Sequence, residues 1–216
     1  MSRGTGVEGT LGPVTTPART RTVAVLLYDD VEVLDALGPF EVLTTAARVA
    51  ARRGEEPPFR VVLVSTTGRL QVTARAGLRV LADVLLDDAG EPDVVLVPGG
   101  VHDAVQHDPA VRAWLRATPA EVVASVCTGA FVLAGAGLLD GVEATTHWED
   151  VEDLRTAFPR VRVVEDVRWT DAGRGLTSAG ISAGLDLALH LVRRLAGEEL
   201  AVATARQMDY RWLTRP

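Results

Sequence analysis

The chain has 216 residues, 47% of them hydrophobic, and a formal net charge of −7 at pH 7. That length suits one domain or two small ones with a sizeable core, while the acidic balance argues against a surface for nucleic acid. No segment approaches the roughly 18 apolar residues that a membrane span needs, so we expect neither nucleic acid nor a membrane as a partner.

Residues 1–20 are rich in Gly, Thr, Pro and Arg and contain no apolar stretch like that of a signal peptide. They predict a disordered N-terminal tail. Residues 21–216 contain no repeat, low-complexity block or interior linker, and they predict a single domain. The missing export signal and the single cysteine favour a cytoplasmic protein.

Strand-like and helix-like segments alternate through this domain. Continuous apolar runs are typical of buried strands, and they occur at residues 22–28, 59–65, 93–97 and in the run that ends at Cys127. Residues 66–82 predict a short hairpin or edge piece, and short strands are expected near 161–165 and 167–170. Helical patterns occupy residues 109–117, 149–158, 181–195 and 198–206, with further helices from Pro39 to about Arg53 and directly after Cys127.

This alternation predicts an α/β fold with a mostly parallel central sheet between two layers of helices, a three-layer, flavodoxin-like sandwich. In such sheets, ligands bind outside the carboxyl ends of the strands. Three loops are expected at that edge: residues 28–39, Pro98-Gly99-Gly100 and Cys127-Thr128-Gly129.

Cys127 lies where a β-branched run stops and a helical pattern begins. A side chain at such a junction is forced out of a tight strand-to-helix turn, the geometry of a nucleophile elbow. The N–H groups and the dipole of the following helix favour the thiolate form, so we expect a reactive cysteine. The alternative is a buried cysteine that acts as a small hydrophobic residue.

Residue usage excludes several classes of chemistry. All 22 basic residues are arginine, and the absence of lysine excludes Schiff-base aldolases, pyridoxal-phosphate enzymes and the Walker phosphate loop. The absence of asparagine excludes a Cys-His-Asn protease. One cysteine and four scattered histidines cannot assemble a cysteine-rich or His-x-x-x-His zinc site, so we expect no metal and no cofactor.

Five short motifs occur in order along the chain. They are Leu34-Asp35-Ala36-Leu37-Gly38-Pro39, Val97-Pro98-Gly99-Gly100, Ser125-Val126-Cys127-Thr128-Gly129, Ala144-Thr145-Thr146-His147-Trp148 and Thr177-Ser178-Ala179-Gly180. Together they resemble the ThiJ/PfpI superfamily of the class I glutamine-amidotransferase-like fold. The resemblance extends from about Thr22 to Leu200.

Details of the motifs separate the branches of that superfamily. Leu191-Val192 follows the late histidine where amidotransferases have a His-x-Glu pair, so glutamine hydrolysis is not expected. Thr128 stands where protease-like members have a histidine, which argues against peptidase activity. Asp35 stands where glyoxalase and chaperone-like members have a glutamate. The chain looks like the isonitrile hydratases, and equally like the sensor domain of AraC-type amidase-like regulators.

The resemblance to isonitrile hydratases implies that the Cys127 thiolate attacks the terminal isonitrile carbon. Water would then release an N-substituted formamide from the thioimidate, the reaction of a hydro-lyase. Asp35, enclosed by Leu34 and Leu37, is the expected acid/base with a raised pKa. The alternative role for Asp35 is a helix N-cap.

Backbone and hydroxyl donors are expected to stabilise a developing negative charge. The candidates are Thr128, through its hydroxyl or its N–H, and the backbone of Gly99 and Gly100. The alternatives are an ordinary first-turn helix residue at Thr128 and a plain strand-ending turn at the two glycines.

Three further residues are expected at the pocket. His147 orients the site or acts as a base, or is a structural histidine held by packing against Trp148. Ser178 caps the long helix and lines the floor of the pocket, and Gly38 lies beside it. The remaining histidines are assigned to solvated loops (His102 and His107) and to a packed position in a helix (His190).

We therefore expect a cofactor-free cysteine enzyme that hydrates a small organic isonitrile, and the resemblance implies a homodimer. Two alternatives stay open. The first is a small-molecule sensor domain without the helix-turn-helix region, for which there is too little room before Pro216. The second is a glyoxalase or stress-protective protein that uses the same thiol.

Overall fold

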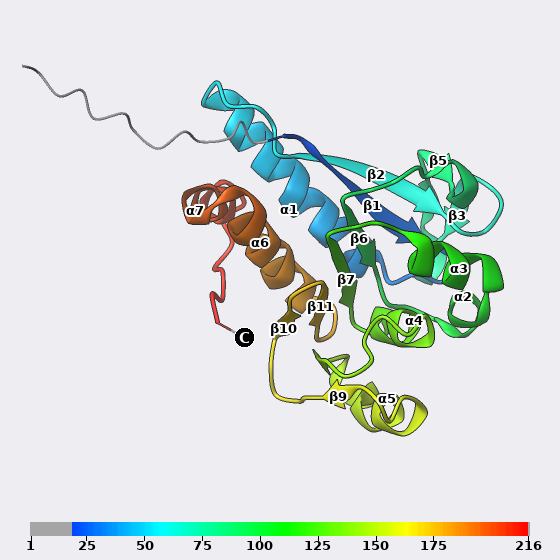
Figure 1. Ribbon diagram of the computed structural model, residues 1–216. Coiled ribbons are helices and arrows are strands. Elements are labelled where there is room, and N and C mark those ends of the chain that lie inside the picture. Colours follow the sequence, from blue (N-terminus) through cyan, green and yellow to red (C-terminus); the bar gives the residue numbers. More distant parts are fainter. Residues whose placement is uncertain (1–18, 216) are drawn as a thin grey trace, which may run out of the picture.

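A seven-stranded sheet forms the centre of the computed structural model, which describes residues 19–215 (Figure 1). Its strands are β1 (Arg21–Leu27), β2 (Phe59–Ser65), β5 (Val84–Leu85), β6 (Val94–Val97), β7 (Val122–Val126), β10 (Trp169–Ala172) and β11 (Gly175–Ser178). They lie in the order β10-β11-β7-β6-β1-β2-β5. Each neighbouring pair is parallel except β10 and β11, which form an antiparallel hairpin at one edge.

Helices cover both faces of the sheet, as Figure 1 shows. One face carries α1 (Val33–Arg52), α6 (Ala183–Ala196) and α7 (Glu198–Gln207), which pack against one another. The other carries α2 (Asp103–His107), α3 (Pro109–Ala117) and α4 (Gly129–Gly135), with α5 (Val151–Ala157) beyond α4. The predicted three-layer α/β fold is confirmed.

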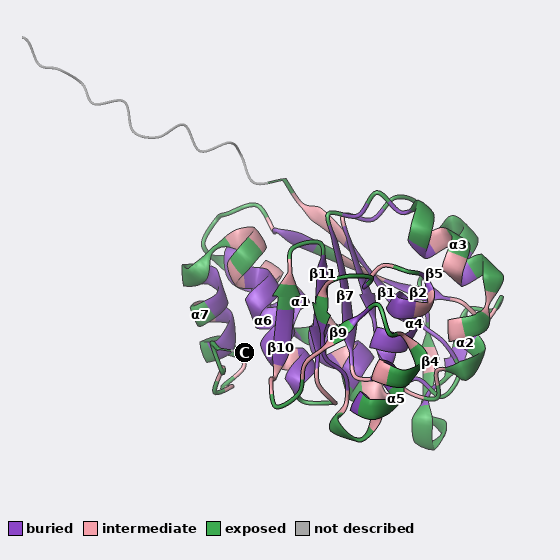
Figure 2. Ribbon diagram, turned by 60° about the horizontal axis from the view of Figure 1, so that its bottom comes forward, coloured by how far each residue is buried: buried purple, intermediate pink, exposed green. Residues whose placement is uncertain are grey.

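The strands are apolar throughout because each face of the sheet is covered. All of β7 is buried: Val122, Ala124 and Val126 pack into the cluster under α1 and α6, and Val123 packs into the opposite cluster. This is the alternation of side chains that a strand imposes. Figure 2 shows the strands buried between the two helical layers.

Helix α1 begins at Val33, so the prediction that it starts at Pro39 is wrong. Proline is typical of a first helical turn, but here it lies inside the helix, where its missing N–H leaves one backbone bond unmade. The consequence is that Asp35 lies in the first turn of a helix rather than in a loop.

Smaller elements complete the fold. The predicted hairpin in residues 66–82 is present as β3 (Gln71–Thr73) and β4 (Arg79–Leu81), joined by the 3-10 turn η1 (Arg75–Gly77). The short pair β8 (Glu143–Ala144) and β9 (Arg162–Val163) is parallel. Two further 3-10 turns are η2 (Leu86–Asp88) and η3 (Trp148–Asp150).

Residues 1–18 of the predicted tail lie outside the described residues. Of the rest of that tail, the guanidinium of Arg19 lies 2.6 Å from the Asp93 carboxylate, and the Thr20 hydroxyl donates to the Pro57 carbonyl at 2.7 Å. Within the described part of the chain, no helix combines the length and apolar character that a membrane crossing requires.

Candidate active site

Cys127 occupies the turn between β7 and α4 with a φ of +55°. This left-handed conformation costs a non-glycine residue about 1–2 kcal/mol, and hydrogen bonds hold it. The Cys127 N–H donates to the carbonyl oxygens of Ser178 at 3.1 Å and Ala179 at 3.3 Å, and the Cys127 carbonyl accepts from the Thr146 hydroxyl at 2.9 Å. The predicted strand-to-helix elbow is therefore fastened to the end of β11 and to the loop after β8.

Two glycines allow the surrounding segments to approach the elbow. A Cβ at Gly129 would lie 2.1 Å from the carbonyl oxygen of Val97, so only glycine lets α4 begin against the end of β6. A Cβ at Gly99 would lie 2.7 Å from Cys127 Cβ and 2.8 Å from Asp35 Oδ2. The Cys127 and Asp35 side chains thus meet across the face of Gly99.

Asp35 is fully buried, and Gly99 N–H donates to its Oδ2 at 3.1 Å. Its Oδ1 is buried without a hydrogen-bond partner among the described residues. Burial raises the pKa of Asp35 from 3.8 to about 7, against the opposing effect of the Gly99 N–H. Asp35 does not cap α1: the N-cap position is Glu32, which makes no side-chain capping bond.

The thiol of Cys127 is protonated in this environment. Burial, followed by the nearby Asp35 carboxylate, raises its pKa to about 12, although the N–H groups of Thr128 and Ile181 act in the opposite direction. The Thr128 N–H at the start of α4 does favour the thiolate, as expected, but desolvation of the anion outweighs this effect and the resting thiol stays protonated.

Thr128 and Gly100 are hydrogen-bonded to each other. The Gly100 N–H donates to Thr128 Oγ1 at 3.0 Å, and the Thr128 hydroxyl donates to the Gly100 carbonyl at 3.0 Å. The Gly99 N–H is engaged by Asp35. These donors are already satisfied, so the expected oxyanion role fits neither glycine nor the Thr128 hydroxyl; the Thr128 backbone N–H faces the sulfur instead.

Cys127 opens into a cavity of about 420 Å³. Its lining combines the elbow with the loops at the carboxyl ends of the strands: Glu32, Arg75, Gly100, Val101, His102, Asp103, Cys127, Thr128, His147, Glu149, Asp150 and Ile181. Carboxylates outnumber basic groups along this wall, so the cavity favours neutral or cationic ligands over anions.

Several of these lining residues escaped the sequence analysis. Arg75 reaches the site because its N–H donates to the Val31 carbonyl at 3.0 Å, which docks the β3–β4 hairpin on the loop after β1. Its guanidinium lies 3.5 Å from Glu32. His102 is the N-cap residue of α2, and its ring packs at a tilt of 38° against that of Phe131, with the ring centroids 4.6 Å apart. Among these residues, only Glu32 could have been predicted from the sequence, because it lies two residues before the motif that contains Asp35.

His147 lines the cavity as predicted. A Cβ at Gly180 would lie 2.0 Å from its ring, so that glycine makes room for the imidazole. Its Nδ1 lies 3.6 Å from the carboxylates of Glu149 and Asp150. Its ring also packs against that of Trp148, with the ring centroids 5.6 Å apart, although Trp148 is itself 76% exposed.

Gly38 and Ser178 do not line the cavity. Gly38 faces Leu185, and a Cβ there would lie 3.1 Å from that side chain, so this glycine serves the close packing of α1 against α6. Ser178 is the last residue of β11 and donates to the Ser125 carbonyl at 3.4 Å. The sequence analysis missed β11 because Thr177-Ser178 reads as the start of the following helix.

The other two histidines lie away from Cys127. His190 is packed as predicted, with its ring 3.9 Å from that of Trp169 and its Nε2 2.7 Å from the Asp171 carboxylate. His107 is exposed, at the end of α2. Between residues 19 and 215 there is no group of three or more His, Cys, Asp and Glu side chains placed to hold a metal ion.

The arrangement places a protonated thiol, which opens into the cavity, beside a fully buried carboxyl that does not itself line the cavity. The Asp35 carboxylate can accept the thiol proton, and Asp35 in its acid form can return a proton to an adduct on sulfur. Tyr28 lies close by, where its hydroxyl donates to the Pro98 carbonyl at 2.9 Å. Burial raises the pKa of Tyr28 well above its usual value, so it stays neutral.

Comparison with known proteins places the chain among relatives with different roles. It is 36% identical to the isonitrile hydratase of Pseudomonas putida, over 87% of this chain and 78% of that protein. It is 33% identical to the HTH-type transcriptional regulator GbdR of Pseudomonas aeruginosa, over 88% of this chain. The match spans 51% of GbdR, about half of its length.

The fold is shared with solved structures. Drosophila melanogaster DJ-1beta superposes with a TM-score of 0.76 at 22% identity, covering 90% of this chain and all of that one. The sequence pattern of the DJ-1/PfpI family matches residues 21–194. The chain belongs to the DJ-1/PfpI family.

Proposed function

We propose that this protein hydrates small organic isonitriles, with Cys127 as nucleophile and Asp35 as acid and base. The observation that carries the proposal is the meeting of the two side chains across Gly99, beside a cavity of about 420 Å³. The 36% identity to an isonitrile hydratase over most of both chains supports it.

The first step forms a thioimidate. The Asp35 carboxylate takes the thiol proton, the sulfur bonds to the terminal isonitrile carbon, and Asp35 returns the proton to that carbon. The product is R–N=CH–S–Cys127, and the carboxylate is regenerated. This addition consumes one thiol and no free proton, which suits a site whose resting cysteine is protonated.

The second step releases the formamide. Asp35 accepts a proton from water, the hydroxide oxygen bonds to the thioimidate carbon, and the proton passes to nitrogen. The C–S bond then breaks, the sulfur recovers the hydroxyl proton through Asp35, and R–NH–CHO leaves. One water is consumed, and both side chains return to their starting states.

The excess of carboxylate side chains around the cavity supports a neutral substrate. Glu32, Asp103 and Asp150 line it together with Arg75, so an anionic ligand would meet net repulsion. An isonitrile carries no net charge and needs no cation to bind. The isonitrile carbon that the thiol attacks is terminal and unhindered. It can therefore approach a cysteine that lies in the narrow space beside Gly99.

The test is turnover of an alkyl isonitrile, followed by the appearance of the formamide in proton NMR. Cys127→Ala should show only the background rate, and Asp35→Asn should lose about 10²–10⁴-fold in rate, as expected for removal of a general acid/base. Asp87→Asn, at an exposed carboxylate in η2, is the matched control and should keep full activity. Wild-type rates in Cys127→Ala would remove the nucleophile from the proposal.

A sensor domain is the second candidate. It is supported by the similarity to about half of GbdR and by the raised pKa of Cys127, which makes the resting thiol a weak nucleophile. Saturable binding of a small molecule without turnover of any isonitrile would favour this function. The expected homodimer stays a prediction, which light scattering after size exclusion would test.

A further inference from the structure

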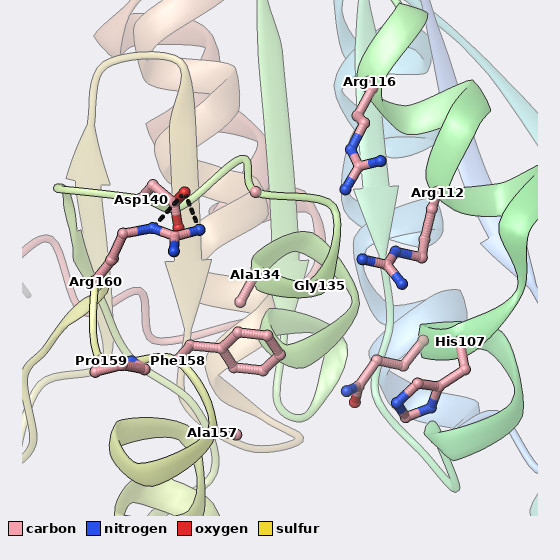
Figure 3. A pocket seen from close by; sticks show the side chains of 12 residues that line it. His107, Arg112, Arg116, Ala134, Gly135, Asp140, Ala157, Phe158, Pro159 and Arg160 are labelled. Carbon is pink, nitrogen blue, oxygen red and sulfur yellow. Dashed lines mark hydrogen bonds and ion pairs between the residues drawn. The ribbon is translucent and has the colours of Figure 1, made fainter.

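A second pocket, rich in arginine, lies apart from Cys127. It has a volume of about 300 Å³ between α3, α4 and the end of α5, and none of its lining residues borders the Cys127 cavity. Figure 3 shows Arg112 and Arg116 extending from α3 toward Phe158 and the Arg160–Asp140 pair on the opposite side.

The charge of this pocket is unbalanced. Among the described residues, Asp140 is the one acidic residue that lines it, and Arg160 donates to that carboxylate with bonds of 3.0 and 2.8 Å. Neither Arg112 nor Arg116 forms an ion pair within the part of the chain that the structure describes. The chain as a whole has a net charge of −7, yet this pocket has more arginine side chains than carboxylates among its described lining residues.

Two details show that the two guanidinium groups are incompletely paired among the described residues. Arg112 Nε is buried and makes no hydrogen bond among the described residues, which is costly for a charged group. Arg112 and Arg116 also stand four positions apart on α3, where like charges destabilise a helix. Arg116 satisfies only its Nε, by donating to the Ala136 carbonyl at 2.9 Å. An anion between the terminal nitrogens of the two guanidinium groups would relieve the repulsion between the arginines.

The shape of the pocket defines the rest of the ligand. The Phe158 ring and the small residues Ala134 and Gly135 give it an apolar wall, and its volume is at the lower end of small-molecule sites. Guanidinium forks match carboxylate and phosphate groups, each of which accepts paired N–H bonds. We propose that the arginine pocket is a second ligand site, for a small organic molecule with a carboxylate or phosphate group and an apolar ring or chain.

Helix α2 separates the two pockets. His102 and Asp103, at its start, border the Cys127 cavity, while Gln106 and His107, near its end, border the arginine pocket. A third hollow, lined by both His102 and Gln106, lies between them. A ligand held by Arg112 therefore contacts a helix that also forms the wall of the cysteine site.

The test is calorimetric titration of the full chain with benzoate and with phenyl phosphate, at low ionic strength to limit screening. Saturable binding of either probe is expected, and the better probe identifies the anionic group. The Arg112→Gln/Arg116→Gln double variant should lose at least tenfold in affinity. Arg116→Gln alone changes an exposed position, so it keeps the test valid if the double variant does not fold.

Two controls locate the bound anion. Arg79→Gln removes an exposed arginine outside both pockets and should bind as wild type does. Arg75→Gln removes the arginine of the Cys127 cavity and should also leave the affinity unchanged. The proposal is overturned if neither probe saturates, if the α3 variants bind as tightly as wild type, or if affinity is lost with Arg75→Gln.

Discussion

Replacing Asp35 with asparagine should make folding stability less dependent on pH. In the folded protein the pKa of Asp35 is about 7, against 3.8 for an exposed aspartate. Between these values the folded state binds more protons than the unfolded state, so this group makes the protein less stable as the pH rises. The contribution of Asp35 to the free energy of unfolding is fully present below pH 3.8. It is lost as the pH rises through about 7.

The size of the effect follows from the two pKa values. Between pH 5 and pH 8, linkage gives a loss of about 2.5 kcal/mol for one such carboxyl, which Asp35→Asn should abolish. Asparagine preserves the acceptor for the Gly99 N–H. Its amide nitrogen replaces Oδ1, an atom without a hydrogen-bond partner among the described residues, so no hydrogen bond found there is broken.

The assay is urea unfolding of both proteins from pH 5 to pH 8, with the difference in unfolding free energy plotted against pH. Other titrating groups cancel in this difference, which should rise by about 2.5 kcal/mol in favour of Asp35→Asn. Asp87→Asn, at an exposed position, should give a flat difference. A flat curve for Asp35→Asn as well would mean that the carboxyl is ionised at ordinary pH, and the assignment of Asp35 as a proton donor would be refuted.

Three other outcomes are expected. The kcat/KM for isonitrile hydration should fall as the pH drops below about 7, because protonation of Asp35 removes the acceptor for the Cys127 proton; a rate that stays constant to pH 5 would contradict the mechanism. Gly99→Ala places a Cβ 2.7 Å from Cys127 Cβ and 2.8 Å from Asp35 Oδ2, so turnover should drop at least tenfold while circular dichroism stays that of a folded protein. Asp186→Ala removes a fully buried carboxylate that lies 2.6 Å from Arg168 and accepts hydrogen bonds from Tyr210 and the Leu213 N–H. Because Arg168 is 34% exposed and stays hydrated, thermal unfolding should show a loss of about 1.5–3 kcal/mol; a loss below 1 kcal/mol would mean that water replaces the carboxylate.

The fold was predictable from the sequence because its strands are continuous apolar runs. Segments such as 93–97 and the run before Cys127 have to be buried on both faces, and only a sheet covered by two helical layers achieves that. The sequence pattern predicted element boundaries wrongly where a residue type is common both at helix starts and in another kind of element. Pro39 resembles a helix start but lies inside α1, and Thr177-Ser178 resembles a helix cap but ends β11.

The candidate site was predictable only in part. The motifs around Asp35, Gly99 and Cys127 are short and local, so they can be recognised along the chain. The hydrogen-bonding state of Thr128 and Gly100 is different, because each satisfies the other from a separate loop. No local pattern reports that pairing, so the sequence could not show that the Gly100 N–H and the Thr128 hydroxyl, two of the expected oxyanion donors, are already engaged.

The sequence by itself determined the α/β alternation, the elbow at Cys127 and the residue types available for chemistry, since these depend on neighbours in the chain. The tertiary structure alone decided that the Cys127 thiol is protonated, because desolvation depends on what packs around a group from distant segments. It also decided the placement of Arg75 beside the cysteine and of Arg112 and Arg116 in a second pocket. Residues that lie far apart along the chain line one pocket only after folding brings them together.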